Sequence, residues 1–105
     1  MKIRITENAL RIRLSNDDLK SLLKEDVLSL SLPIAKDEIF FILQTCDEPI
    51  TPESAVSFMH GNLVIRVNKN DLHQWISSRE TCLTCPITHP NNRTLTLIVE
   101  KDYLG

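Results

Sequence analysis

A stretch that occurs twice decides the fold: it reads LRIRLSNDDL at residues 10–19 and LVIRVNKNDL at residues 63–72. The same offset of 53 positions aligns Leu30 with Leu83 and Pro33-Ile34 with Pro86-Ile87. Self-similarity at a fixed period indicates repeated supersecondary units. We therefore predict pseudo-repeat one over residues 1–46 and pseudo-repeat two over residues 54–103, packed about a pseudo-twofold axis. Each copy would be marginal alone, so we expect them to share one core in a single domain, residues 1–105.

The hydropathy pattern predicts the order strand, strand, helix, strand, strand in each copy. Alternating residues predict strands, and the spacing of Leu19, Leu22 and Leu23 predicts an amphipathic helix. In the first copy the expected ranges are 2–6, 10–15, 16 to about 25, 27–32 and 38–45. In the second they are 55–59, 62–67, 69–78, 81–85 and 94–101.

Local signals fix the helix starts and the fold class. Ser15 is followed three residues later by Asp18, which is typical of a capping box, and Asn68 is expected to cap the second helix. We predict an α+β fold in which two ββαββ pseudo-repeats form one mixed or barrel-like sheet with two short helices. The aromatic residues Phe40, Phe41, Phe58 and Trp75 are interpreted as core.

Composition narrows the functional classes. The formal net charge is −2 at pH 7, so the chain lacks the overall positive charge of a dedicated nucleic-acid binder, although a local basic face remains compatible with it. No apolar run approaches the roughly 20 residues of a membrane helix, and the first residues lack the apolar stretch of a signal peptide. We expect a cytoplasmic protein without membrane contact. Three cysteines argue against a disulfide framework.

The first two strands carry a cluster of positive charge. Alternation places Lys2, Arg4, Arg11 and Arg13 together on the outward face of the first hairpin. One interpretation is a surface that contacts nucleic-acid phosphates. The alternative is a solvated face that is neutralised by Asp or Glu side chains of the same chain.

The candidate metal ligands are Cys82, Cys85 and His89, because CxxC spacing with a nearby histidine is compatible with zinc. On a strand, however, residues three apart point to opposite faces. We therefore predict no metal and no cofactor. No Gly-rich phosphate loop and no nucleophile–base motif is evident, so we predict a protein that is not an enzyme.

Part of the chain resembles a known DNA-binding unit. NALRIRL at residues 8–14, followed by DLKSL at residues 18–22, resembles the swapped-hairpin unit of AbrB/MazE-type proteins, and residues 62–100 match it more loosely. The proline that ends the second strand in that family is replaced by Ser15 and Asn68. The resemblance implies a fused pseudo-dimer, and it implies DNA contact as a regulator or antitoxin.

Over its whole length the chain is similar to a small, uncharacterised bacterial domain family. The similarity rests on the MKIRI opening, the N-x-x-R-x-R-L segment at residues 8–14 and the close at residues 95–102. Our leading hypothesis is a non-enzymatic binding or regulatory module that contacts DNA through the first hairpin. The alternative is a protein–protein interaction or assembly module without nucleic-acid binding, as a homo-oligomer or with another protein. That alternative expects residues 94–101 to form an exposed sheet edge.

Overall fold

The computed structural model describes residues 1–102 and has an α+β fold with ten elements. The first half holds β1 (Lys2–Ile5), β2 (Ala9–Leu14), α1 (Asn16–Glu25), β3 (Val27–Ile34) and β4 (Asp37–Cys46). The second half holds β5 (Val56–Met59), β6 (Asn62–Asn68), α2 (Lys69–Ile76), β7 (Cys82–Thr88) and β8 (Thr94–Lys101). The predicted types and order of the elements are confirmed. Residue 103, which ends predicted pseudo-repeat two, lies outside the described residues.

The strands form two sheets rather than the one mixed or barrel-like sheet that we predicted. The first sheet has the order β1-β2-β8-β7 and the second has the order β3-β4-β6-β5. Each sheet contains one strand hairpin from each half of the chain, joined by a central parallel pair, β2 with β8 or β4 with β6. The prediction of a single sheet is wrong because the hairpins of one half pair with those of the other half, and the barrel does not close.

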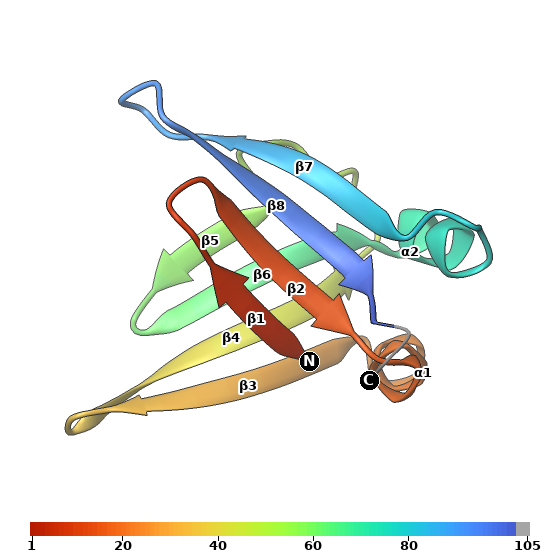
Figure 1. Ribbon diagram of the computed structural model, residues 1–105, viewed down its shortest axis with the longest axis horizontal. Helices are drawn as coiled ribbons and strands as arrows, with labels where there is room; N and C mark the ends of the chain where they lie inside the picture. The colour runs from red at the N-terminus through yellow and green to blue at the C-terminus, as the bar shows by residue number, and fades with distance from the viewer. Residues whose placement is uncertain (103–105) are drawn as a thin grey trace.

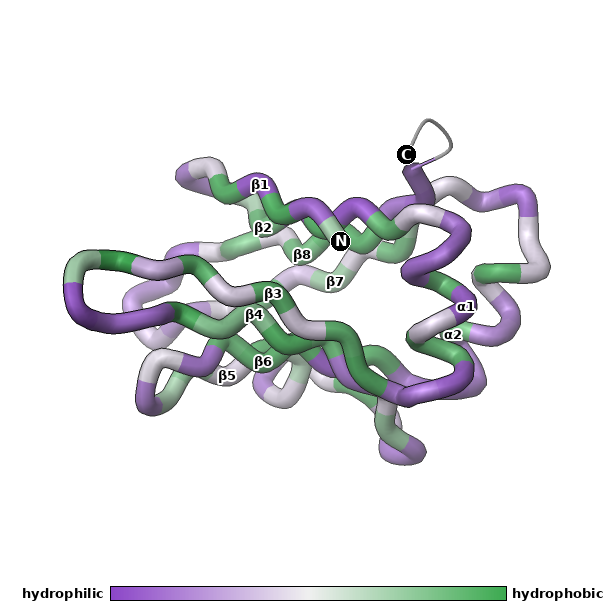
Figure 2. The backbone as a smooth tube through the Cα atoms, turned by 90° about the horizontal axis from the view of Figure 1, so that it is seen from below, coloured by the Kyte–Doolittle hydropathy of each residue, from purple (hydrophilic) through white to green (hydrophobic). Residues whose placement is uncertain are grey.

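The two sheets stack as layers with the core between them (Figure 2). Each sheet buries one apolar face against the other, as in a sandwich. The buried side chains on the strands include Ile12, Leu14, Leu43 and Ile65. Both helices lie at one end of the molecule, and the four hairpin turns lie at the opposite end (Figure 1).

The helices close one end of the core with an apolar stripe each. Leu19 and Leu22 of α1 and Leu72 and Trp75 of α2 are buried. Ser15 accepts a hydrogen bond from the Asp18 N–H at 3.1 Å, and the Asp18 carboxylate accepts one from the Ser15 N–H at 3.0 Å. This confirms the predicted capping box, which satisfies backbone donors that a helix start otherwise leaves unpaired.

Two expectations about burial and edges are wrong. β8 is paired on both sides, so residues 94–101 form an interior strand and not an exposed edge. Phe41 and Trp75 belong to the core as predicted, whereas Phe58 is 63% exposed and Phe40 is 38% exposed. Phe58 lies on β5, a strand of four residues at the margin of its sheet, where little covers it.

Candidate interaction surfaces

The predicted basic face exists as a geometric unit on the outer side of the first sheet. β1 pairs antiparallel with β2, so that Lys2 stands opposite Arg13 and Arg4 stands opposite Arg11. Opposed residues of paired strands lie about 5 Å apart, so four positive side chains share a small area. The alternation of β2 sends these arginines outward, because Leu10, Ile12 and Leu14 between them are buried.

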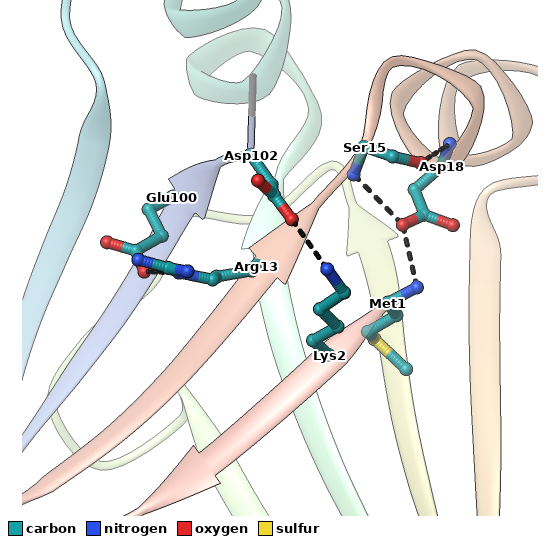
Figure 3. A network of polar contacts seen from close by, with 7 residues as sticks. All are labelled: Met1, Lys2, Arg13, Ser15, Asp18, Glu100 and Asp102. Atoms are coloured by element: carbon teal, nitrogen blue, oxygen red, sulfur yellow. Dashed lines mark hydrogen bonds and ion pairs between the residues drawn. The ribbon is translucent and has the colours of Figure 1, made fainter. Parts of the chain in front are cut away.

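Two acidic residues lie on the same face: Glu100 on β8, the strand next to β2, and Asp102 just after β8. β8 runs parallel to β2 and places Glu100 beside Arg13. The Glu100 carboxylate lies 2.6 Å from Arg13 Nε and 3.4 Å from an Arg11 terminal nitrogen. Asp102 lies 3.1 Å from Lys2 Nζ (Figure 3). These ion pairs match the alternative in which acids of the same chain neutralise the face.

These ion pairs affect the pKa of Arg13 and the charge that remains on the basic face. The hydrogen bond to Glu100, and then the negative charge of that carboxylate, raises the pKa of Arg13. Within residues 1–102 no carboxylate lies within ion-pairing distance of Arg4, and its side chain is exposed. The face therefore retains an excess of positive charge, which is weakened most at Arg11 and Arg13.

A second polar contact ties the start of the chain to α1. The Met1 ammonium donates to the Asp18 carboxylate at 2.7 Å (Figure 3). Burial alone would raise the pKa of Asp18, but hydrogen bonds from the ammonium and from the Ser15 N–H outweigh that effect and hold its pKa below the ordinary value. This contact stabilises the capping box and offers no free charge for a ligand.

The structure does not bring Cys82, Cys85 and His89 together. Cys82 begins β7 and pairs with Glu100, whereas Cys85 packs against the core and His89 lies beyond the end of the strand. Burial raises the pKa of the Cys85 thiol, which disfavours the thiolate that a metal requires. Among residues 1–102 no group of three potential ligands could hold a metal ion.

Sequence reasoning missed an apolar surface at the end of the molecule away from the helices. Five side chains of the sandwich's inner faces are exposed there, and we call them the apolar rim: Ile5, Leu30, Leu32, Ile34 and Phe58. Pairing shows which way they face: Leu30 stands opposite the buried Phe41, and Ile5 stands opposite the buried Leu10. The apolar rim therefore extends the core past the area that the opposite sheet covers.

The apolar rim borders a groove between the margins of the two sheets. The groove has a volume of about 360 Å³ and is lined by Ile3, Ile5, Leu30, Ser31, Leu32 and Phe41. Its lining residues place it between β1 and β3, each of which is an outer strand of its sheet. Because β1 has four residues and β3 has eight, the β3–β4 hairpin extends past the strand that would cover it (Figure 1).

Comparison with known proteins gives a family but no activity. A model described as a family of unknown function, DUF7009, matches residues 1–104. No curated protein and no solved structure matches the chain. Within residues 1–102 neither helix is long and apolar enough to cross a membrane. The chain thus belongs to DUF7009, an uncharacterised family, as the likeness of its whole length to a small uncharacterised domain family led us to expect.

Proposed function

We propose that this protein is a non-enzymatic protein-interaction module whose contact surface is the apolar rim. The observation that carries the proposal is the exposure of large apolar side chains on one end of the sandwich, with Phe58 and Ile5 each 63% exposed. Exposed apolar surface costs roughly 25 cal/mol per Å² relative to burial. Ile5, Leu30 and Leu32 line one groove, and an exposed apolar patch of this kind typically marks a site that a partner covers.

The charge distribution supports a protein partner more than a nucleic acid. Glu100 and Asp102 hold three of the four cations of the basic face in ion pairs. Phosphates would compete with these carboxylates for the same donors. The net charge of −2 adds a weak repulsion at long range.

We also propose that the two halves are copies of one unit with exchanged hairpins, as in the AbrB-like likeness. Equivalent parallel pairs, β2 with β8 and β4 with β6, support this relation. So does a pair of matching hydrogen bonds: Thr45 N–H donates to the Asp26 carbonyl, and Lys101 N–H donates to the Thr81 carbonyl. These contacts favour an offset of 55 to 56 positions after the helices, rather than the 53 that aligns the first hairpins.

Site-specific photo-cross-linking tests the proposed function. A photoreactive residue in place of Leu32 reports contacts of the apolar rim, and the same residue in place of Thr84, exposed on β7, is the matched control. We expect discrete protein adducts from position 32 in the native host, of this chain with itself or with another protein, and none from position 84. Absence of adducts at position 32, or equal labelling at both positions, would reject the apolar rim as the contact surface.

A second candidate function is phosphate contact through the basic face, which the exposed and unpaired Arg4 favours within the described residues. Titration of a labelled random-sequence duplex at low and near-physiological salt tests it. Binding that weakens steeply with salt and disappears in an Arg11→Ala/Arg13→Ala variant would support this function. Absence of binding at low salt would leave the DNA-binding likeness one of fold alone.

A further inference from the structure

The sheet margins differ in how well they are protected from pairing with another chain. The outer strands are β1 and β7 in the first sheet and β3 and β5 in the second. Proteins commonly protect such edges with charges, prolines or short strands. β1 carries Lys2 and Arg4, β7 has Pro86 within its length, and β5 has only four residues.

β3 lacks these protections along most of its length. It reads VLSLSLPI over Val27–Ile34, spans eight residues and contains no charged side chain. Its one proline, Pro33, is next to the last residue. Val27, Leu30, Leu32 and Ile34 are each 40–47% exposed. A long, neutral, apolar edge of this kind is a ready template for a further strand.

The phase of the β3–β4 ladder shows which backbone groups remain unpaired. Thr45 N–H donates to the Asp26 carbonyl at 3.0 Å. Hydrogen-bonded and non-bonded pairs alternate along an antiparallel ladder, so Leu28 with Leu43 and Leu30 with Phe41 are the next bonded pairs. The N–H and C=O groups of Ser29 and Ser31, which lie between them, therefore point away from the sheet. Pro33 shares this phase, so its missing N–H costs β3–β4 pairing nothing.

We propose that a second copy of this chain pairs with the β3 edge, strand β3 against strand β3 in antiparallel orientation about a twofold axis. The proposal rests on the proposed function, because it names the partner of the apolar rim. Centring the axis at Leu30 sets Ser29 of one copy opposite Ser31 of the other, and both residues then exchange hydrogen bonds. The same register sets Val27 opposite Pro33, where the proline carbonyl accepts a bond from the Val27 N–H and the Val27 carbonyl receives none from the proline nitrogen.

Side chains favour a like strand as the occupant. In this register the leucines of the incoming strand lie on the same face as Leu28, Leu30 and Leu32, because opposed residues share a face. They extend the apolar face beneath the exposed Ile5 and cover the groove between β1 and β3. A neutral strand pairs with its own copy without like charges meeting. Self-pairing of β1 would instead bring Lys2 and Arg4 of both copies together.

The test is the mass of the protein in solution over a wide concentration range, measured by sedimentation equilibrium. We expect a monomer–dimer equilibrium in which the fraction of dimer rises with protein concentration. Ser31→Pro removes an outward N–H and leaves the β3–β4 ladder intact, so it should leave the protein monomeric at every concentration. Thr84→Pro is the matched control, because Thr84 has the same outward phase on β7, as the Lys101 N–H to Thr81 carbonyl bond shows.

A second variant keeps the test informative if the Ser31→Pro protein does not fold. Ser31→Lys changes no backbone group, puts a charge on the edge and should also weaken the dimer. Far-ultraviolet circular dichroism shows whether each variant is folded. A native protein that stays monomeric throughout, or a dimer that survives in folded Ser31→Pro and Ser31→Lys, would overturn self-pairing. Adducts from position 32 to another protein would then still support the proposed function, so the two failures are distinguishable.

Discussion

At the scale of single residues, Glu100 controls the strength of the basic face. Its carboxylate contacts both Arg11 and Arg13, and its side chain is 15% exposed. Glu100→Gln keeps the shape of the side chain and removes the charge that these guanidinium groups share. The four cations would then face outward with one carboxylate, that of Asp102, as an ion-pair partner among the described residues.

We expect Glu100→Gln to strengthen binding of a DNA duplex at low salt. Each phosphate contact contributes about −0.9 to the slope of log affinity against log salt, so two released arginines steepen it by about two. Fluorescence titration at several salt concentrations measures this slope. Glu80→Gln, at an exposed position away from the face, is the control for the equal change in net charge. An equal slope in both variants would show that Glu100 does not restrain the arginines.

Asp18 makes the start of α1 dependent on pH. Its pKa is held below the ordinary value of 3.8 in the folded state. A lowered carboxyl pKa stabilises the fold fully above the unfolded-state pKa, and this stabilisation is lost as the pH falls through the lower folded-state pKa. The capping box therefore weakens in acid.

We expect Asp18→Asn to lower the free energy of unfolding by about 0.5–1 kcal/mol near neutral pH, because it removes a charge from a helix N-terminus. The difference from the native protein should shrink toward zero in acid below the folded-state pKa. Urea unfolding at both conditions measures it. Asp17→Asn, in the same turn but without the capping contacts, is the control. A difference that persists in acid would mean that the charge of Asp18 contributes nothing.

At the scale of elements, Lys101 fastens the end of α2 to β8. Its Nζ donates to the carbonyls of Trp75 at 2.8 Å and Ser78 at 2.9 Å, and it lies 5.1 Å from the centre of the Trp75 ring. Carbonyls at a helix end lack partners within the helix, so a cation there satisfies them and interacts well with the helix dipole.

Replacing Lys101 with methionine keeps much of the apolar stem and removes these donors. We expect Lys101→Met to lower the free energy of unfolding by about 1.5–3 kcal/mol, the range for hydrogen bonds to charged groups. Urea unfolding followed by the fluorescence of Trp75 measures the loss. Lys20→Met, at an exposed position on α1, should change stability far less. Equal stability of Lys101→Met and the native protein would contradict this role of the lysine.

Local signals predict the helices and strands of this fold, but they do not predict which strands pair with one another. The Ser15 and Asn68 caps and the alternating strands are decided by neighbours in sequence, and both caps are confirmed. The division into two sheets depends instead on the pairing of β2 with β8, whose residues lie more than 80 positions apart. No local pattern encodes that choice.

The candidate sites also contain features that the local sequence predicts and features that depend on how the strands pair. Alternation alone places Lys2, Arg4, Arg11 and Arg13 on one face, which the β1–β2 pairing bears out. The neutralising acids come from β8, so sequence could name them only as an alternative. The apolar rim was missed because the Leu and Ser alternation of β3 is equally typical of a half-buried strand. Its exposure arises from the unequal lengths of β1 and β3 in opposite sheets.

At the scale of the whole molecule, each half of the chain depends on the other for its core. Both sheets contain strands of both halves, and the buried Leu22 of α1 belongs to the same core cluster as Trp75 of α2. A core shared in this way cannot lose one half and keep the other, because each sheet would lose two of its four strands. Unfolding should therefore be a single cooperative transition.

Leu22→Ala tests this coupling across the two halves. The side chain of Leu22 is fully buried, so its truncation should lower the free energy of unfolding by about 2–5 kcal/mol. Trp75 reports on the other half of the chain, yet its fluorescence should reveal the whole loss, with the same midpoint as circular dichroism. Leu23→Ala, at a half-buried neighbour, should cost less. A Trp75 transition left unchanged by Leu22→Ala would mean that the halves unfold separately and that the shared core does not join them.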